Sequence, residues 1–342
     1  MSSRRGILAA LESAADYVSG ATLATELGIS RAAVWKHVSA LKRDGYDIEG
    51  VRARGYRLVA TPVALSEAAI RARCPSTRIG RRILVLDVTR STNSDAMALG
   101  REGEPEGTVV IAEEQTAGRG RLGRAWESKR GVNLYTSFLL RPAIAPGRAP
   151  QLSLVAGIAV AETVAEEGVA ARIKWPNDVV TVAGENADGA APGSLRKVCG
   201  ILTEIEAEAD RAAFVVVGIG VNLNSTREHF PPDLLPRATS ILLERGRPVD
   251  RAAFTARLLE RFEECYDAWL RGGFAAVAPR WRALSILEGR RVAVAAPGES
   301  YEGVCAGIDD DGTLLVNVGQ GAPRRVLAGD VTLPDGYGGQ DQ

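Results

Sequence analysis

The stretch SRAAVWKHVSALKRDG, residues 30–45, decides the fold of the N-terminal part of this chain. Val34, Val38 and Leu41 recur at helical spacing, and Ser30 is a residue type that caps a helix N-terminus. The opposite face carries small and charged residues. We therefore expect an amphipathic helix that packs on one side and offers its polar face to a partner.

Two shorter helices are expected before this stretch. The first carries Ile7, Leu8 and Leu11 on one face. The second has Thr22 as its N-cap and ends at Gly28, because glycine readily adopts the left-handed conformation of a C-cap. A short helix, a glycine turn and a capped helix follow each other as in a helix-turn-helix unit.

After the third helix, residues 46–58 alternate around a basic tip, Arg52-Ala53-Arg54-Gly55, which predicts a two-stranded hairpin. The whole pattern predicts a winged helix-turn-helix. Its third helix would enter the major groove of DNA, and the wing arginines would contact phosphates. The candidate DNA-binding residues are Ser30, Arg31, Ala32, Trp35, Lys36, Ser39, Arg43, Arg52 and Arg54. The alternative is a small dimerisation or regulatory module with a solvated basic face.

The charge distribution favours a local affinity for nucleic acid. The chain has 42 Lys and Arg residues and 42 Asp and Glu residues, so its formal net charge is zero. Residues 1–60 alone contain nine basic and six acidic residues. No apolar run reaches the roughly 18 residues that a membrane span needs, so we expect a cytoplasmic protein with no membrane partner.

The four cysteines lie far apart in the chain, and only two histidines accompany them. This spacing fits neither a disulfide framework nor a zinc site. We expect buried, inert thiols and no metal bound by protein side chains.

We expect an α+β protein with a winged helix-turn-helix in residues 1–62, a central domain in 63–284, a small β-barrel in 285–335 and a flexible tail in 336–342. Central strands are expected at residues 83–87, 108–113, 132–140, 172–175, 197–206 and 214–221, and helices at 151–167 and 251–270. This mixture indicates one mixed sheet covered by helices.

Four short strands are expected at 291–295, 301–308, 313–318 and 324–327, a spacing that suits a barrel. Residues 183–194 are small and rich in Gly and Pro, which indicates a mobile surface loop.

The most unusual stretch is residues 118–124, Gly-Arg-Gly-Arg-Leu-Gly-Arg, which we call the arginine loop. Three arginines between three glycines cannot pack a core, and the glycines let the backbone approach a ligand closely. At ~4 Å and an effective dielectric constant of about 20, one cation–phosphate contact is worth on the order of 4 kcal/mol before desolvation. The loop therefore suits a triphosphate and a carboxylate. The alternative is a solvated basic loop that binds RNA loosely.

Two lysines stand at strand ends. Lys174 begins the sequence Lys-Trp-Pro-Asn-Asp that follows one strand, and Lys197 opens another. A lysine at a strand end can meet a substrate beyond the sheet edge, although most lysines are ordinary surface charges. Each lysine alone is weak evidence.

Two further motifs have ambiguous meanings. Ser91-Thr92-Asn93 offers hydroxyl and amide groups to a polar ring, or else caps a helix that begins near Asp95. Gly218-Ile219-Gly220 resembles half of a dinucleotide fingerprint, but it lacks the strand, GxGxxG and helix in succession. We therefore reject dinucleotide binding.

Taken in order, these segments resemble the biotin protein ligase family, and specifically its bifunctional biotin operon repressor branch. The resemblance covers nearly the whole chain and rests on GRGRLGR followed by Trp126, KWPND, KVCGIL and GIGVNLN, with SRAAVWKH pointing to the repressor branch. It implies a class II synthetase-like central domain and an SH3-like C-terminal barrel. The sequence departs from the family at Leu122, where some relatives have arginine, and in the longer 183–194 loop, which puts the strength of dimerisation in doubt.

The resemblance implies two overlapping sets of site residues. The biotin-binding set is Ser91, Thr92, Asn93, Gln115, Gly118, Arg119, Arg121, Lys197 and Gly200, with Arg119 acting through its backbone. The ATP-binding set is Arg121, Arg124, Trp126, Lys174, Asn177, Lys197 and Asn222. Arg121 and Lys197 would meet the biotin carboxylate and the α-phosphate, and Asp178 would orient or deprotonate the acceptor lysine. These three are the candidate catalytic residues.

The implied reaction uses ATP with Mg²⁺ bound through the triphosphate. Biotin would become biotinyl-5′-AMP and then pass to a lysine of a biotin carboxyl carrier protein. The resemblance further implies a repressor of biotin-synthesis genes. We hypothesise that the arginine loop is disordered without ligand, closes over the adenylate and orders a dimerisation face, so that a homodimer binds operator DNA.

Three other functions remain open. The first is a lipoate or octanoate ligase. The second is a transcription regulator that senses biotin without catalysis, and the third is a biotin ligase whose N-terminal module binds no DNA.

Overall fold

The computed structural model describes residues 3–14, 16–43, 46–60, 65–76, 78–183, 193–296 and 298–334, and for residues 5, 43, 47 and 60 it describes the backbone alone. The chain divides into two compact units. One is Met1–Ala64 with Arg130–Val132, and the other is Leu65–Lys129 with Asn133–Gln342. The predicted boundary at residue 62, most of the predicted 183–194 loop and the tail 336–342 lie outside the described residues.

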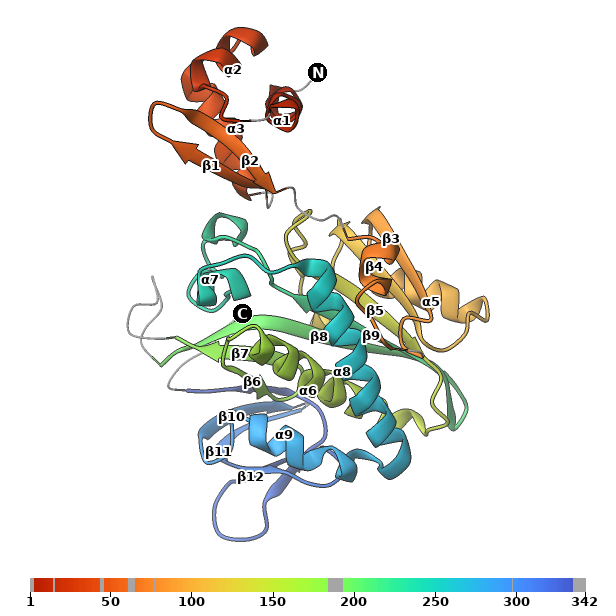
Figure 1. The fold of residues 1–342 in the computed structure, drawn as a ribbon. Coiled ribbons are helices and arrows are strands. Elements are labelled where there is room, and N and C mark those ends of the chain that lie inside the picture. The colour runs from red at the N-terminus through yellow and green to blue at the C-terminus, as the bar shows by residue number, and fades with distance from the viewer. Residues whose placement is uncertain are drawn as a thin grey trace. The chain divides into compact units, whose positions relative to one another are not determined.

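The first unit is a winged helix-turn-helix (Figure 1). Its elements are α1 (Ser3–Ser13), α2 (Gly20–Leu27), α3 (Arg31–Arg43) and the antiparallel hairpin of β1 (Asp47–Val51) and β2 (Gly55–Ala60). Ile7, Leu11, Val34, Val38 and Leu41 are all buried in one apolar cluster. The apolar stripes expected on the first and third helices are therefore confirmed.

The second helix begins earlier than predicted. Its N-cap is Ser19 rather than Thr22, because the Ser19 hydroxyl accepts the backbone N–H of Thr22 at 3.0 Å. Gly20, a poor helix former, occupies the first helical position and concealed this start. The two other caps are confirmed: Gly28 is left-handed at φ 63°, and the Ser30 hydroxyl accepts a backbone N–H at 3.1 Å.

The second unit is built on a seven-stranded mixed sheet with the order β3-β4-β5-β9-β8-β7-β6. The strands are β3 (Arg82–Thr89), β4 (Thr108–Gln115), β5 (Leu134–Leu140), β6 (Ala171–Lys174), β7 (Asp178–Val182), β8 (Leu195–Glu208) and β9 (Arg211–Val221). β3 and β4 pair in parallel, and the other neighbours pair antiparallel. All six expected strands are present, whereas β7 was not predicted.

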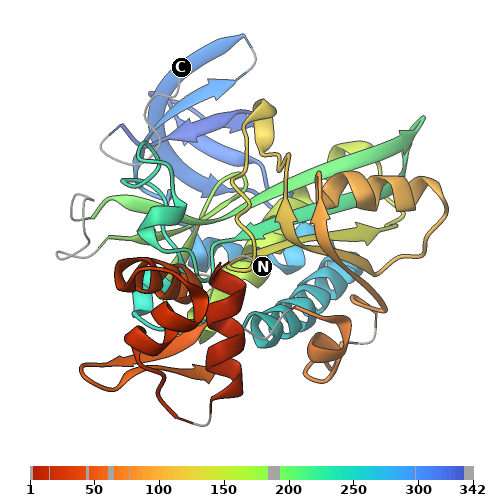
Figure 2. The same ribbon diagram turned by 90° about the horizontal axis from the view of Figure 1, so that it is seen from above.

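Helices cover both faces of this sheet. Val110, Leu139 and Val216 face α5 (Thr92–Arg101), whereas the alternate strand residues join the main core cluster with α6 (Gln151–Glu166) and α8 (Arg251–Gly272). Figures 1 and 2 show the long β8–β9 hairpin between α5 and α8. The shorter helices are α4 (Glu67–Arg71), α7 (Ile241–Arg245) and α9 (Ala278–Leu284).

The C-terminal part of this unit is a five-stranded antiparallel sheet with the order β13-β12-β11-β10-β14. Its strands are β10 (Arg291–Ala296), β11 (Glu299–Ile308), β12 (Leu314–Asn317), β13 (Arg324–Val326) and β14 (Asp330–Thr332). The buried residues Val292, Val294 and Val316 belong to the same core cluster as the central sheet. The two sheets therefore share one core, and β14, which was not predicted, follows the last expected strand.

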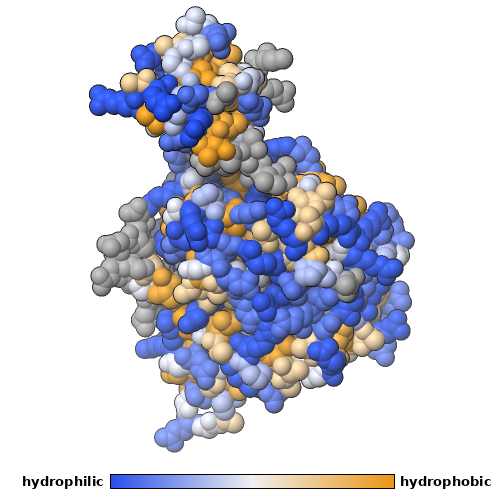
Figure 3. All heavy atoms as spheres, viewed as in Figure 1, coloured by the Kyte–Doolittle hydropathy of each residue, from blue (hydrophilic) through white to orange (hydrophobic). Residues whose placement is uncertain are grey.

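No helix in the described part of the chain is long and apolar enough to cross a membrane. On the face shown in Figure 3, hydrophilic residues cover most of the surface of the second unit, and apolar residues are scattered among them.

All four cysteines are unpaired. Burial raises the pKa of each thiol, namely those of Cys74, Cys199, Cys265 and Cys305. The thiols are therefore protonated at neutral pH and poor nucleophiles. Within the described ranges, no group of three or more His, Cys, Asp or Glu side chains is arranged to hold a metal ion.

Candidate active site

A cavity of about 270 Å³ lies over the central sheet and gathers residues from distant parts of the chain. It is lined by every residue expected to bind biotin or ATP except Gly118, namely Ser91, Thr92, Asn93, Gln115, Arg119, Arg121, Arg124, Trp126, Lys174, Asn177, Lys197, Gly200 and Asn222. The remaining catalytic candidate, Asp178, lines it as well. Arg121 and Lys197 are thus close enough to share one small molecule.

Three glycines on the sheet face under the cavity make room for side chains from other elements. Gly218 and Gly220 lie on β9, and Gly200 pairs with Gly220 from β8. A Cβ atom on Gly218 would lie 2.0 Å from Asn93 Oδ1, one on Gly220 would lie 2.6 Å from the Trp126 ring, and one on Gly200 would lie 2.9 Å from that ring. Only glycine permits these approaches. Gly218 and Gly220 are visible in the sequence as two glycines at strand spacing within GIGVNLN, but the packing that requires them is not.

Ser91, Thr92 and Asn93 form one wall where α5 begins. The helix starts at Thr92 rather than near Asp95, and the Ser91 side chain makes no capping hydrogen bond. Both the backbone N–H and the hydroxyl of Thr92 donate to Gln115 Oε1, at 2.9 Å and 3.1 Å. Helix capping therefore does not explain the motif, and a polar edge faces the cavity.

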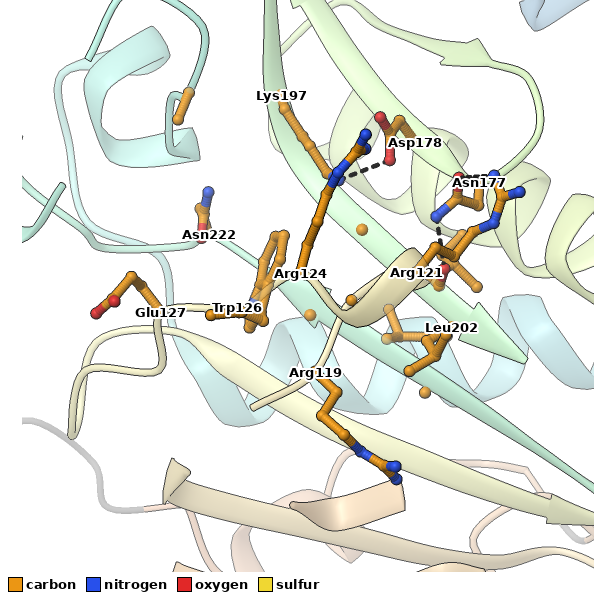
Figure 4. A pocket seen from close by; sticks show the side chains of 18 of the residues that line it. Arg119, Arg121, Arg124, Trp126, Glu127, Asn177, Asp178, Lys197, Leu202 and Asn222 are labelled. Atoms are coloured by element: carbon orange, nitrogen blue, oxygen red, sulfur yellow. Dashed lines mark hydrogen bonds and ion pairs between the residues drawn. The ribbon is translucent and has the colours of Figure 1, made fainter. Parts of the chain in front are cut away.

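The arginine loop crosses the cavity as a tight hairpin (Figure 4). The N–H of Gly120 donates to the carbonyl of Arg124 at 2.7 Å, and that of Trp126 donates to the carbonyl of Gly118 at 2.9 Å. A Cβ atom on Gly118 would lie 2.5 Å from the Trp126 carbonyl oxygen. Leu122, the departure from the family pattern, has φ 55° and is 73% exposed. The glycines thus let the two arms of the hairpin close.

Cationic side chains gather beside the Trp126 ring. Lys197 Nζ lies 2.7 Å from Asp178 Oδ1 and 5.3 Å from the centroid of the Trp126 ring. Lys174 also lines the cavity and is 7% exposed. In Figure 4, Arg119 points away from this group. The cationic cluster therefore consists of two lysines and the two later arginines of the loop, with Asp178 beside the lysines.

Burial and neighbouring charges shift the pKa values of Lys174 and Asp178. Burial lowers the pKa of Lys174, and the positive charge of Lys197 lowers it further, while Asp178 opposes the change. Burial alone would raise the pKa of Asp178, but the charges of Lys197 and Lys174 outweigh it and hold this pKa below its usual value. Asp178 is therefore a carboxylate at neutral pH and forms an ion pair with Lys197.

The C-terminal sheet contributes Asp330 to the site. Its carboxylate lies 2.7 Å from Arg124 Nη2 and 3.6 Å from Arg121 Nη1. Arg121 also donates to the carbonyl of Gly329 at 3.1 Å and to Asn177 Oδ1 at 3.2 Å. Asp330 stands 206 residues from Arg124 and no local motif marks it, so sequence reasoning missed it.

The DNA-binding candidates lie on the first unit. Arg31, Ala32, Trp35 and Lys36 are exposed on α3, Ser39 is partly exposed, and Arg52 is exposed on the wing. Arg54 lies 3.0 Å from Asp16 and 4.2 Å over the Tyr17 ring. Ser30 caps α3, and the side chain of Arg43 lies outside the described residues. The helix face is open, whereas this wing arginine already has partners.

Family models match three parts of the chain. The model of the biotin/lipoate A/B protein ligase family matches residues 85–222, an HTH domain matches residues 4–57, and the biotin protein ligase C-terminal domain matches residues 289–333. The fold and the site thus define an ATP-dependent protein ligase of the biotin/lipoate type with an N-terminal helix-turn-helix domain.

Individual relatives narrow this class. The chain is 36% identical to the bifunctional ligase/repressor BirA of Bacillus subtilis, over 93% of this chain and 94% of the relative. It is 33% identical to that of Escherichia coli, over 95% and 96%. The solved biotin protein ligase of Aquifex aeolicus in complex with biotin and ATP is 28% identical, with a TM-score of 0.61, over 74% of this chain and 98% of that one. The chain belongs to the biotin protein ligase family, in its bifunctional ligase/repressor branch.

Proposed function

We propose that this protein is an ATP-dependent ligase that joins biotin to a lysine of a biotin carboxyl carrier protein, and that it represses biotin-synthesis genes. The observation that carries the proposal is the meeting of Arg121, Lys197 and Asp178 with the polar wall at residues 91–93 in one cavity. The similarity to bifunctional ligase/repressors over more than nine-tenths of the chain supports both activities.

Biotin would lie against the polar wall, over the central sheet. Ser91, Thr92 and Gln115 supply hydroxyl and amide groups for the uncharged ureido ring, which needs both donors and acceptors. Gly118 and Arg119 would act through their backbone. The missing side chains at Gly200 and Gly220 let the Trp126 ring pack close to the sheet, and the one missing at Gly218 makes room for Asn93, so both side chains help to shape the cavity. These features suit an uncharged polar bicycle with a carboxylate tail.

ATP would lie on the cationic side of the cavity. Arg121, Arg124, Lys174 and Lys197 supply positive charge for the phosphates, with Trp126, Asn177 and Asn222 beside the nucleotide. Asp330 holds two of these arginines, and a phosphate would compete with it for them. Mg²⁺ would arrive on the triphosphate and offset its charge.

In the first step, a biotin carboxylate oxygen attacks the α-phosphorus, and the bond from that phosphorus to the bridging oxygen breaks, so that pyrophosphate leaves. Arg121 and Lys197 neutralise the negative charge that gathers there. Lys197 is suited to this because Asp178 fixes its ammonium group at 2.7 Å. The product is biotinyl-5′-AMP.

In the second step, the ε-amine of the carrier lysine attacks the acyl carbon, and AMP leaves. A free lysine has a pKa of about 10.4, so the amine must first lose a proton. Asp178 is the candidate that orients the amine or accepts this proton, and its lowered pKa favours orientation over proton transfer.

The first unit supplies the repressor function. The exposed face of α3, with Arg31, Trp35 and Lys36, suits the major groove. We place the switch in the arginine loop: the adenylate stabilises its hairpin, a homodimer forms, and two winged helices meet an operator of matching symmetry. Such a protein needs ATP, carrier and DNA in one compartment, so we place it in the cytoplasm.

The enzymatic proposal is tested by pyrophosphate release from ATP on addition of biotin or of lipoate, followed by label transfer to a carrier domain. Release with biotin and transfer to the carrier are expected. Release with lipoate instead would make the protein a lipoate ligase, and no release with either acid would leave a non-enzymatic sensor.

The repressor proposal is tested by gel shift with DNA from upstream of biotin-synthesis genes, across a salt titration. Biotin with ATP should raise the affinity. Equal affinity with and without the two substrates would remove the coupling, and absence of any shift would leave a ligase whose N-terminal domain binds no DNA.

A further inference from the structure

A carboxylate outside the expected site, Glu204, connects two parts of the proposed biotin site. It lies on β8, four residues beyond Gly200, which lines the cavity. Its Oε2 atom accepts from Asn93 Nδ2 at 2.8 Å and from Arg119 Nη2 at 3.0 Å. Asn93 belongs to the polar wall and Arg119 to the arginine loop, so one oxygen holds both.

The hydrogen bonds of Asn93 show that it acts through its neighbours. Its Nδ2 also donates to the carbonyl of Leu202 at 3.2 Å, and its Oδ1 accepts from the Ser137 hydroxyl at 2.6 Å. The residue is 4% exposed, and Gly218 lacks a side chain where Asn93 Oδ1 approaches. Its polar groups are engaged within the protein, so Asn93 fixes the start of α5 instead of reading the ligand.

The contacts of Arg119 explain why its side chain is not part of the cationic cluster. Its guanidinium donates to Glu204 and, at 3.1 Å, to the Ser94 hydroxyl, and Figure 4 shows it directed away from Lys197 and Asp178. With the side chain held there, the backbone of the loop lies over the cavity.

We propose that Glu204 is a positioning residue for biotin: through Asn93 and Arg119 it sets the distance between the polar wall and the arginine loop. This rests on the proposed function for the identity of the ligand. An exposed ion pair alone contributes little, and here the arginine is 46% exposed. The effect comes from the shared carboxylate, because one change releases both the buried amide and the loop.

The chain offers a matched control two residues along the same strand. Like Glu204, Glu206 pairs with an arginine; its partner, Arg101 at 2.8 Å, lies on α5. The side chains of Glu206 and Arg101 are 40% and 60% exposed. Neither residue lines the cavity. Glu206→Gln therefore removes the same charge from the same strand without releasing either wall of the site.

The experiment compares Glu204→Gln with Glu206→Gln in the full chain. For Glu204→Gln we expect the KM for biotin to rise about 5- to 10-fold, as for a charged hydrogen bond that is partly solvent-exposed, with the KM for ATP within about 2-fold of the parent. Arg119→Gln should raise the KM for biotin similarly, and the double variant should exceed the larger single effect by less than about 2-fold. A biotin KM unchanged by Glu204→Gln, an equal rise for ATP, or additive effects would overturn the proposal.

A second readout needs no substrate. Trypsin should cut the arginine loop several-fold faster in Glu204→Gln than in Glu206→Gln, at equal thermal stability. Equal cutting in both variants would overturn the positioning role even if biotin proved not to be the ligand. Conversely, a parent protein that binds no biotin but shows the difference in cutting would refute the proposed function and leave the positioning role standing. If Glu204→Gln fails to fold, Arg119→Gln decides by the KM for biotin and Ser94→Ala by the rate of tryptic cutting, because Arg119→Gln itself removes a tryptic site.

Discussion

Replacing Asp178 by asparagine should slow the formation of biotinyl-adenylate. The carboxylate forms an ion pair with Lys197 at 2.7 Å, and the side chains of Asp178 and Lys197 are 15% and 26% exposed. Asparagine keeps the shape but loses the charge, so that Lys197 and the buried Lys174 repel each other without compensation. The ammonium group that should meet the α-phosphate then moves away.

The size of this effect follows from the burial of the pair. Removing one partner of a buried ion pair costs about 3–5 kcal/mol, and partial exposure reduces this to about 2–3 kcal/mol. If that loss falls on the transition state, the rate falls about 100-fold, because each 1.36 kcal/mol corresponds to tenfold. We expect both half-reactions to slow, since Lys197 and the acceptor amine depend on the same carboxylate.

The assay separates the two half-reactions. Biotin-dependent exchange of pyrophosphate into ATP reports adenylate formation, and single-turnover transfer from preformed biotinyl-adenylate to a carrier reports the second step. Glu302→Gln is the control, because it removes an exposed carboxylate from an ion pair with Arg291 on the C-terminal sheet. Normal exchange in Asp178→Asn would refute the positioning of Lys197, and normal transfer would end the role of Asp178 in the second step.

The stability of the same variant should depend on pH in a defined direction. The pKa of Asp178 is lower in the folded protein than in the unfolded chain, where it is about 3.9. Its contribution is therefore present above about pH 4 and is lost as the pH falls through the folded-state value. In urea unfolding, the parent should exceed Asp178→Asn at pH 7 and at pH 5, and the difference should shrink below pH 4. A constant difference down to pH 3 would show that the lost stability is not electrostatic.

Three further changes test other parts of the site and of the first unit. Gly220→Ala places a Cβ atom 2.6 Å from the Trp126 ring, which the proposal places beside the nucleotide, and should weaken ATP binding in calorimetry by about 1–3 kcal/mol. Gly157→Ala, whose Cβ would lie 3.5 Å from its nearest neighbour, should leave ATP binding unchanged; equal binding by both variants would contradict the role of Gly220 in seating Trp126. Asp330→Asn releases Arg121 and Arg124 and should speed tryptic cutting of the arginine loop several-fold, and an unchanged rate would deny the C-terminal sheet this role. Lys36→Gln should reduce the slope of log binding constant against log salt concentration for operator DNA by about one unit. Arg54→Gln should reduce this slope less, because Arg54 already has Asp16 as its partner. The reverse order would mean that the wing is the main phosphate contact.

The winged helix was largely predictable because its signals are local. Ser30, Gly28 and the apolar stripe of α3 each act within one or two turns of helix, and all three are present in the structure. The one wrong cap, Thr22, arose because the helix accepts a glycine in its first turn. The short strand β7 was not predicted, also because of its local sequence. Asp178–Val182 has five residues without alternation, too few to register as a strand before its neighbours are known.

The site was predictable as a set of residues but not as a set of contacts. The resemblance gave the residues that line the cavity, and Gly218 and Gly220 were visible in the sequence although their meaning was not. Glu204 and Asp330 could not be found, because an acidic residue in a strand has no distinguishing pattern. Their importance comes from partners 85 and 206 residues away.

The three arginines of the loop illustrate the difference between predicting the residues of the site and predicting their contacts. In the sequence they are equivalent, each beside a glycine and each suited to an anion. In the structure Arg119 pairs with Glu204 on the central sheet, whereas Arg121 and Arg124 pair with Asp330 on the C-terminal sheet. The last two line the cavity close to the lysines and are suited to phosphate, while the first is directed away and serves the backbone of the loop. A count of charges would assign all three arginines to the nucleotide. The fold places only Arg121 and Arg124 on the side proposed for the nucleotide, because Glu204 of the central sheet holds the side chain of Arg119 elsewhere.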